Sequence, residues 1–373
     1  MSEQVQSKGP DLFLAGGATG GHIWAGVSVA EEWKRRYPKS KILFIGARGG
    51  LEERLVPKAG FALELLSVGS LNGVGLVRQV RTFLKLPFAF AKSLVLLLKF
   101  RPAVVLGVGG YASGPMVMTA RWVGWLWGVK IAVLEQNVMP GMTNRILGRF
   151  SHQILAAFPE TRKYFGSTPV LVTGNPIRTS MKPMAPAPRD PFTIFVFGGS
   201  QGAMGINTLV LDALPHLRGL STQIRFIHQT GERDFDRVRE GHARAESGAR
   251  VEKFIYEMPE VYSQASLLIC RAGSSTLSEI AAVRRAAILI PLVSADRHQE
   301  ANAQVFSDRG AARVLFQKRS TGEDLARLIC ELMADHSQIS RMEAAVAAFH
   351  HPAAAEAVVS GITQGASTHD SSS

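Results

Sequence analysis

Short apolar runs alternate along the chain with longer amphipathic stretches, and glycine-rich turns join them. The pattern starts with an apolar run at Asp11–Ala15, a turn at Gly16–His22 with the sequence GGATGGH, and an amphipathic stretch at Ile23–Tyr37. A second apolar run follows at Ser40–Ile45. This order predicts a strand, a glycine turn, a helix and a strand, which together form a βαβ unit with parallel strands.

The same arrangement recurs through the rest of the chain. Further strands are predicted at Ala103–Gly107, Lys130–Leu134, Gln153–Ala156, Val170–Val172, Thr193–Phe197, Gln223–His228, Val251–Phe254, Ser266–Cys270 and Ala287–Ile290. Helices are predicted between them, including Met116–Trp127 and Thr276–Arg285. The four prolines of Lys182–Pro191 predict a linker between two such series. We therefore expect an α/β protein with two doubly wound Rossmann-like domains, at residues 9–178 and 190–349, whose parallel sheets face a cleft.

The composition agrees with two globular domains and indicates the cellular environment of the protein. The 373 residues are 46% apolar and 19% charged. The two cysteines, Cys270 and Cys330, fit no zinc or CxxC spacing, which favours a reduced, cytosolic environment. No signal-peptide core and no uninterrupted apolar run of membrane-spanning length are found, so we expect no spanning helix. The polar ends, residues 1–8 and 364–373, are expected to be disordered.

The net charge of +12 is placed unevenly. The stretch Leu65–Leu134 contains no Asp or Glu but eight Lys or Arg residues, interleaved with Leu and Phe. A basic and apolar surface of this kind favours an anionic membrane face. The alternative is a set of ordinary core helices with solvated bases. Nucleic acid is not expected as a partner, because no binding motif accompanies the charge.

The stretch Ala265–Pro291 carries the strongest chemical pattern. It predicts a strand, a loop of small residues at Arg271–Ser275 and a helix, so that the start of the helix faces open space where a phosphate can bind. Glu279, one turn into this helix, has two interpretations. It either closes a capping box with Thr276 in the sequence TLSE, or accepts hydrogen bonds from the hydroxyls of a ribose. Spacing alone leaves both open.

Other candidates lie in turns that follow strands. The GGSQG turn around Ser200 either cradles a phosphate or is a tight βα turn with a capping serine. His22 lies at a helix start, where the dipole lowers a histidine pKa and favours a neutral proton acceptor; the alternative is a bond to nearby backbone. Glu135–Asn137 is expected to point into the cleft, unless it is an ordinary polar loop. Arg178 either meets a diphosphate or forms a surface ion pair. The first turn lacks GxGxxG in register, which disfavours a nicotinamide cofactor.

Taken together these segments resemble the MurG family of peptidoglycan N-acetylglucosaminyltransferases. The similarity runs from about Leu12 to Ala357 and rests on motifs in the family's order: GGATGGH, GVGGYASGP, LEQN, GNPIR, GGSQGAMGIN, CRAGSSTLSE and DRHQEANA. The chain departs from the family pattern by an extra Ala18 in the first loop, by Ala25 in place of a proline, and by Leu134 and His298.

The resemblance implies a two-domain, B-type glycosyltransferase. Such an enzyme moves N-acetylglucosamine from UDP-N-acetylglucosamine to the 4-hydroxyl of undecaprenyl-linked lipid I with inversion, at the cytoplasmic face of the inner membrane. The C-terminal helix, about 350–363, is expected to return to the first domain. His22 is the expected catalytic base, with Glu135 as its competitor. The implied substrate-binding residues are Thr19, Gly20, Gly21, Tyr111, Asn137, Arg178, Ser200, Ile255, Ser274, Ser275, Thr276, Leu277, Ser278, Glu279 and Gln299.

No cofactor and no protein-bound metal are expected, because the sequence has no DxD pair placed for one. Three other functions share parts of this pattern. They are transfer to another lipid acceptor, epimerisation of a UDP-sugar, and a non-catalytic membrane scaffold that retains a nucleotide site.

Overall fold

The computed structural model describes residues 9–17, 19–69, 76–186, 188–199, 201–294 and 296–364, with only the backbone for 76–83. The chain divides into two compact units. Unit 1 consists of Met1–Arg178 and Ala353–Ser373, and unit 2 of Thr179–Pro352. The ends expected to be disordered lie outside the described residues, except Gln364, which is the last residue of the final helix.

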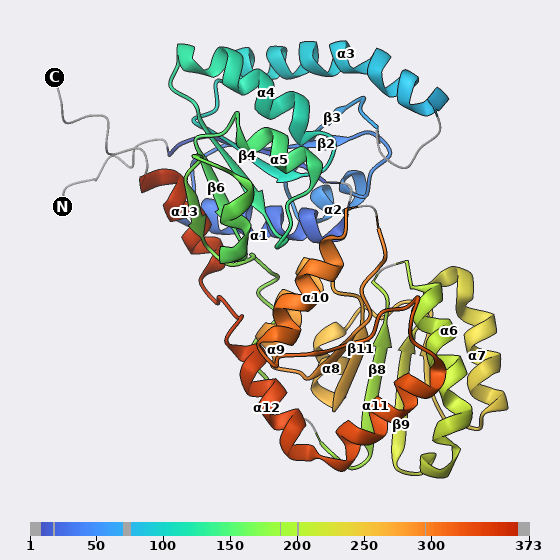
Figure 1. The fold of residues 1–373 in the computed structure, drawn as a ribbon. Coiled ribbons are helices and arrows are strands. Elements are labelled where there is room, and N and C mark those ends of the chain that lie inside the picture. The colour runs from blue at the N-terminus through green and yellow to red at the C-terminus, as the bar shows by residue number, and fades with distance from the viewer. Residues whose placement is uncertain are drawn as a thin grey trace. The chain divides into compact units, whose positions relative to one another are not determined.

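Unit 1 is built around a parallel sheet with the strand order β3-β2-β1-β4-β5-β6-β7 (Figure 1). The strands are β1 (Leu12–Gly16), β2 (Ile42–Ala47), β3 (Ala62–Leu66), β4 (Val104–Gly109), β5 (Lys130–Glu135), β6 (Gln153–Ala156) and β7 (Val170–Val172). The helices are α1 (Gly20–Arg36), α2 (Glu52–Lys58), α3 (Leu76–Phe100), α4 (Ser113–Val123), α5 (Met142–Gly148) and α13 (Ala354–Gln364), with 3-10 turns η1 (Gly124–Leu126) and η2 (Pro159–Tyr164).

The period-2 alternation of the strands decides which helices cover which face. In β1, Phe13 and Ala15 pack with side chains of α3 and α4, whereas Leu12 and Leu14 pack with α1. Val358 and Ile362 of α13 belong to this second cluster, so the last helix completes the α1 side of the sheet. Both faces of the inner strands are therefore buried, which explains why these strands are continuous apolar runs.

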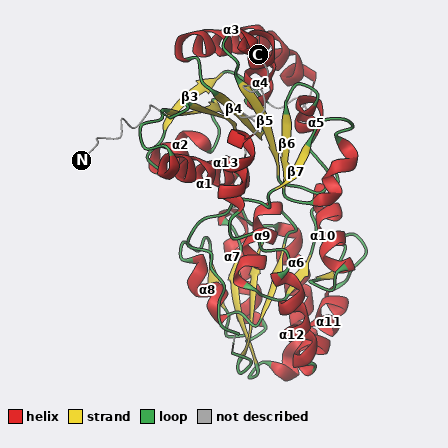
Figure 2. Ribbon diagram, turned by 90° about the vertical axis from the view of Figure 1, so that its left-hand side faces the viewer, coloured by secondary structure: helices red, strands yellow, loops and turns green. Residues whose placement is uncertain are grey.

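Unit 2 repeats the architecture with the strand order β10-β9-β8-β11-β12-β13, and helices cover both faces of its sheet (Figure 2). The strands are β8 (Phe192–Phe197), β9 (Ile224–Gln229), β10 (Arg250–Glu252), β11 (Leu267–Cys270), β12 (Ala287–Leu289) and β13 (Arg313–Val314). The helices are α6 (Met204–Ala213), α7 (Phe235–Arg244), α8 (Met258–Gln264), α9 (Ser274–Val283), α10 (His298–Asp308), α11 (Gly322–Ala334) and α12 (His336–Ala347), with 3-10 turns η3 (Leu214–Leu220) and η4 (Glu232–Asp234).

The prediction of two doubly wound α/β domains is confirmed, and the differences lie at element ends. Helix α4 begins at Ser113, three residues before the predicted Met116, and gives way to a 3-10 turn after Val123. Strand β3 was not predicted. Its burial is mostly partial, so its sequence ALELL lacks the continuous apolar signal of the inner strands.

The proline-rich linker is fastened to unit 2 over much of its length. Arg285, which is buried, donates from Nη2 to the carbonyl of Ala185 at 2.8 Å. The hydroxyl of Ser266 donates to the carbonyl of Pro188 at 2.6 Å, and Arg189 pairs with Glu343 at 2.8 Å. The chain therefore joins unit 2 well before β8 begins.

Candidate active site

In each unit the candidate loops follow two neighbouring strands from which the chain continues in opposite directions along the sheet. In unit 2 these strands are β8 and β11, and in unit 1 they are β1 and β4. Ligands of open α/β sheets bind beyond the carboxyl ends of the strands at such switch points. The glycine-rich loops predicted to bind substrate therefore lie where this architecture places ligands.

Helix α9 of unit 2 begins earlier than predicted, and this removes the capping-box interpretation. Its first residue is Ser274 and its N-cap is Gly273, whose extended backbone offers no side chain for a cap. Thr276 is then the third helical residue, and Glu279 lies in the second turn, out of reach of the N-cap. The helix supplies no acceptor for its first-turn N–H groups, and its dipole adds positive potential there. The helix start is suited to an anion.

A buried tyrosine orients the carboxylate of Glu279 through a hydrogen bond. Tyr262 donates from its hydroxyl to Glu279 Oε2 at 3.4 Å. The Tyr262 ring is fully buried and packs edge-on against Phe195 and Phe197, at 5.8 and 6.0 Å between ring centroids. Glu279 itself is half-buried. This leaves the carboxylate oriented and still accessible at the surface of the unit.

The remaining α9 candidates differ in what they offer a ligand. Ser275 and Thr276 are half-buried at the helix start. Ser278 donates its hydroxyl to the carbonyl of Ser274 at 2.9 Å. Leu277 is different, because its side chain is fully buried and its N–H donates to the carbonyl of Gly273 at 2.9 Å. The side chain of Leu277 therefore belongs to the core of unit 2, and its predicted contact with substrate stays a prediction.

Two polar side chains hold the loop before α9 in place. Asn302 of α10 is fully buried and donates to the carbonyl of Ala272 at 3.1 Å. Arg271 donates to the carbonyl of Ile290 and to Gln317 Oε1, each at 2.9 Å. Gln299, the other candidate on α10, accepts from the N–H of Leu292 at 2.9 Å. Sequence reasoning named Gln299 as a substrate-binding residue and missed the supporting roles of Asn302 and Arg271.

The loop after β8 approaches other backbone closely. Gly199 and Gly202 have φ values of +91° and +73°, which favour glycine. A Cβ on Gly202 would lie only 1.9 Å from the carbonyl oxygen of Thr230. Ser200 lies outside the described residues, so its predicted phosphate contact stays a prediction. The N–H of Ile255, one of the implied substrate-binding residues, donates to Gln229 Oε1 at 2.8 Å.

In unit 1 the two glycine-rich loops touch each other. The N–H of Gly17 donates to the carbonyl of Gly109 at 3.0 Å. A Cβ on Gly110, which has a φ of +85°, would lie 2.7 Å from the Gly17 carbonyl oxygen. Only glycine permits this approach. The extra Ala18 lies outside the described residues.

His22 lies at the start of α1, close to these loops. Thr19 is the N-cap, and its hydroxyl accepts from the N–H of His22 at 3.4 Å and lies 2.9 Å from His22 Nδ1. A Cβ on Gly109 would lie 3.0 Å from His22 Nε2. Gly20 and Gly21 form the first two residues of the helix. The imidazole is thus fixed at Nδ1 by the cap, and Nε2 faces the loop after β4.

Glu135 is held inside unit 1. It is 1% exposed, and its Oε1 accepts from the backbone and side-chain nitrogens of Asn137 at 2.8 and 3.1 Å. Its Oε2 accepts from Asn144 of α5 at 2.8 Å. The expectation that all three side chains of Glu135–Asn137 point into a cleft is corrected, because Glu135 and Gln136 are buried and only Asn137 is half-buried. Both carboxylate oxygens of Glu135 thus hold the loop after β5 in place through hydrogen bonds.

The last two candidates of unit 1 are partly accessible. The guanidinium of Arg178 lies 5.6 Å from the ring of Trp24 in α1, within cation–π distance. Tyr111 follows β4 and is exposed. Within the ranges that the structure describes, no three His, Cys, Asp or Glu side chains gather in a way that would hold a metal ion.

Unit 2 also contains a buried chain of polar side chains that sequence reasoning missed. Asn207 donates to Asp234 at 2.7 Å, so its Oδ1 accepts from His228 Nε2 at 3.1 Å. His228 Nδ1 then accepts from His242 Nε2 at 3.0 Å, and His242 Nδ1 accepts from the hydroxyl of Ser247 at 2.8 Å. Every link is satisfied with both imidazoles neutral. Burial lowers the pKa of His228 to about 3 and that of His242 to about 4.

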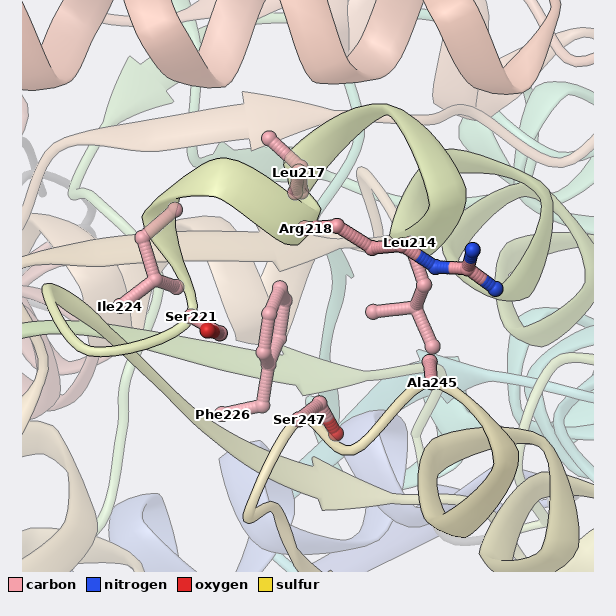
Figure 3. A pocket seen from close by; sticks show the side chains of 8 residues that line it. All are labelled: Leu214, Leu217, Arg218, Ser221, Ile224, Phe226, Ala245 and Ser247. Atoms are coloured by element: carbon pink, nitrogen blue, oxygen red, sulfur yellow. The ribbon is translucent and has the colours of Figure 1, made fainter.

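A cavity of about 20 Å³ lies next to Ser247, the last member of this hydrogen-bonded series, with Phe226 and Leu214 in its wall (Figure 3). A space of this size holds about one water molecule. It is far too small for a nucleotide, so it has no part in substrate binding.

The free energy of unfolding of the protein is expected to fall as the pH is lowered below about 6.5, because of this histidine pair. In the unfolded chain the histidines have a pKa near 6.5 and bind protons below this pH. In the folded protein their pKa values are about 3 and 4, so they stay neutral over the same range. The stabilisation is complete above that pH and is lost progressively toward pH 4, by roughly 2–4 kcal/mol between pH 6.5 and 5. Urea unfolding followed by circular dichroism at several pH values measures this slope.

The double variant His228→Asn/His242→Asn should have a clearly shallower slope over the same window. The matched control is His336→Asn, at an exposed position, which should keep the wild-type slope. Equal slopes in the wild type and the double variant would contradict the assignment.

Comparison with known proteins agrees with this arrangement. Residues 12–156 match the glycosyltransferase family 28 N-terminal domain, and residues 193–358 match the glycosyltransferase family 28 C-terminal domain. Two relatives carry the name UDP-N-acetylglucosamine--N-acetylmuramyl-(pentapeptide) pyrophosphoryl-undecaprenol N-acetylglucosamine transferase. The one from Syntrophus aciditrophicus is 43% identical over 93% of this chain and 96% of its own length. The one from Citrifermentans bemidjiense is 39% identical over 94% and 98%.

Two solved structures are similar to this chain along nearly its whole length. The crystal structure of Acinetobacter baumannii MurG has a TM-score of 0.75 and 28% identity, and the match covers 95% of this chain and 100% of that one. A UDP-N-acetylglucosamine 2-epimerase has a TM-score of 0.68 with only 11% identity over 98% of both chains. The second likeness concerns the fold alone.

Proposed function

This chain belongs to glycosyltransferase family 28, and we infer that it transfers N-acetylglucosamine from UDP-N-acetylglucosamine to undecaprenyl-linked lipid I, giving lipid II for peptidoglycan synthesis. The observation that carries this conclusion is the chain-long similarity, at 39% and 43% identity, to transferases named for that reaction. The two parallel-sheet units are the Rossmann-like domains of the B-type glycosyltransferase fold.

Unit 2 is proposed to bind the donor. The start of α9 would face the diphosphate, because its first-turn N–H groups and dipole favour an anion. Glu279 would accept from the ribose hydroxyls, since Tyr262 holds one oxygen and the capping role is excluded. Ile255 would lie beside the base, and Gln299 beside the sugar hydroxyls. Ser200 would contact the diphosphate as the resemblance implies.

Unit 1 is proposed to bind the acceptor and supply the base, with Thr19–Gly21, Asn137 and Tyr111 around the reacting sugars. The acceptor 4-hydroxyl attacks the anomeric carbon, its proton passes to His22 Nε2, and UDP leaves with the electron pair of the broken bond. A single displacement inverts the configuration. The cap contact with Thr19 holds His22 at Nδ1, and Nε2 faces the loop after β4, where it is proposed to accept the proton.

Glu135 is proposed to position Asn137 rather than to accept the proton. Both of its oxygens already accept hydrogen bonds from amide groups of its own unit. Leaving-group charge would be stabilised by the α9 helix start and by Arg178. The displacement involves no change of oxidation state, so no redox cofactor is needed.

The decisive experiment is incubation of the protein with labelled UDP-N-acetylglucosamine and lipid I. We expect label in lipid II, with UDP released in equal amount. Unchanged lipid I in the presence of folded protein would overturn the proposal. Loss of label to an epimerised soluble sugar without lipid would instead indicate an epimerase, and nucleotide binding without any turnover would indicate a scaffold.

Unit 1 is further proposed to attach peripherally to the cytoplasmic face of the inner membrane through one apolar and basic surface. We call this the α3–α4 surface, and its exposed members are Leu84, Phe88, Val95, Leu98, Trp122, Trp125 and Leu126. Phe88 and Trp125 are 73% and 71% exposed. Helices α3 and α4 pack side by side (Figure 1), and the ring of Phe90 stacks on Trp122 at 5.4 Å.

Positive charge surrounds this surface. Lys99 of α3 and Arg121 of α4 are exposed, as is Arg101 directly after α3. Aromatic side chains at the headgroup level and bases beside them favour anionic lipid. None of the helices that the structure describes is long and apolar enough to cross a membrane. The α3–α4 surface therefore offers a means of attachment that needs no spanning segment.

The double variant Trp122→Ser/Trp125→Ser is expected to lower binding to vesicles containing phosphatidylglycerol by tenfold or more. Each exposed indole would lose an insertion energy of about 1 kcal/mol. Cosedimentation with vesicles measures the change, and turnover on a short-chain acceptor in detergent should stay near the wild-type value. Phe316→Ser, a partly exposed aromatic of unit 2, is the matched control. Unchanged vesicle binding would rule out this surface.

A further inference from the structure

Gln229 is a buried polar residue that neither the sequence nor the reaction singled out. It is the last residue of β9 and pairs with Phe197, the last residue of β8. Its side chain is 3% exposed. A buried amide needs partners for both its oxygen and its nitrogen, and those partners decide its role.

The two ends of the Gln229 amide hold two different segments. Its Oε1 accepts from the N–H of Ile255 at 2.8 Å, in the segment that follows β10. Its Nε2 donates to the carbonyl of Gly199 at 3.0 Å, in the glycine loop that follows β8. These segments are 56 residues apart in the chain, and one side chain joins them.

Backbone hydrogen bonds next to Gln229 add to the connection between these segments. Thr230 donates its N–H to the carbonyl of Glu252 at 2.9 Å, and Gly231 donates to that of Lys253 at 3.1 Å. Gly202 packs directly on the carbonyl of Thr230. Gly199 has a φ of +91°, a conformation that its own sequence does not enforce. The bond from Gln229 fixes the direction of the Gly199 carbonyl.

We propose that Gln229 is a positioning residue of the donor site, which holds Gly199 after β8 and Ile255 after β10 in a fixed relation to each other. The proposal rests on the proposed function, in which the loop meets the diphosphate and the segment meets the base. Gln229 itself contacts no ligand. It lowers the cost of binding, because both segments are ordered before the donor arrives.

The test uses Gln229→Met, which keeps the length and removes both hydrogen bonds without adding charge. We expect the KM for UDP-N-acetylglucosamine and the Kd for UDP to rise about tenfold, from two lost hydrogen bonds. The kcat at saturating donor should stay within about twofold of the wild type, because bound donor restores the arrangement. Hydrogen exchange of the Ile255 amide should accelerate in the free variant and slow again with UDP.

Gln229→Asn is the second variant, since it stays polar but is too short to reach both segments, and it should act in the same direction if the Met variant folds poorly. Gln223→Met, at an exposed position on the same chain segment, is the matched control and should bind UDP as the wild type does. If the wild type binds UDP and both Gln229 variants bind it equally well, the positioning role is wrong. If the wild type binds no UDP, the proposed donor class is wrong and this role is overturned with it.

Discussion

Replacing His22 with alanine is expected to lower kcat by about 10²–10⁴-fold, the range for loss of a general base. The Kd for UDP should stay nearly unchanged, since His22 belongs to unit 1 and the proposed contacts to the nucleoside, Glu279 and Ile255, belong to unit 2. The physical reason is the proposed role of His22 Nε2 as the acceptor of the proton, with the ring held at Nδ1 by the cap at Thr19. Steady-state turnover with lipid I, together with calorimetric binding of UDP, separates the two quantities.

Two further measurements make this result specific. Added imidazole should restore part of the turnover of His22→Ala, because the lost side chain leaves space beside Gly109. Glu135→Gln should lose less turnover than His22→Ala and chiefly lower stability, since Asn137 and Asn144 lose their charged acceptor. If Glu135→Gln were the more damaging change and imidazole gave no rescue, Glu135 would replace His22 as the base.

The second large effect is expected for Glu279→Gln, which should raise the Kd for UDP and the KM for the donor about 10–100-fold. A carboxylate that accepts from two ribose hydroxyls contributes about 1.5–3 kcal/mol to binding, and the amide accepts through one oxygen only. Calorimetry with UDP measures the loss. The matched control is Glu260→Gln, an exposed position on α8, which should bind UDP normally.

A nucleotide lacking the ribose hydroxyl tests the same contact from the ligand side. The 2′-deoxy form of UDP should bind the wild type more weakly than UDP, whereas Glu279→Gln should hardly distinguish the two. Full discrimination by the variant would mean that another group reads the ribose.

The sequence predicted the strands of both sheets well, because strands buried on both faces must be continuous apolar runs. Ala103–Gly107 and Thr193–Phe197 agree with β4 and β8 to within two residues. It did not predict β3, whose side chains are only partly buried. Residue spacing also gave a wrong indication of where helix α9 begins. TLSE matches a capping box, but the backbone of Gly273 starts α9 before Thr276 is reached.

The positions of the loops that carry the candidate residues were predicted, whereas the side chains that support these loops were missed. Glycine loops and helix starts carry local signals, so Thr19–His22 and Ser274–Glu279 could be named from the chain alone. Supports such as Asn302 with Ala272, or Gln229 with Gly199, pair residues far apart in sequence. No spacing rule connects such residues, because the sheet order brings them together. The inward turn of Glu135 depends in the same way on Asn144, which belongs to the next helix.

The return of α13 to unit 1 has a consequence for how the protein is made. Unit 2 is one unbroken stretch of chain, whereas unit 1 needs side chains from Val358 and Ile362 to close one face of its sheet. During synthesis the ribosome releases all of unit 2 before those residues emerge. The unit that begins first is therefore completed last, and the part of its apolar face that α13 covers stays uncovered until the end of translation.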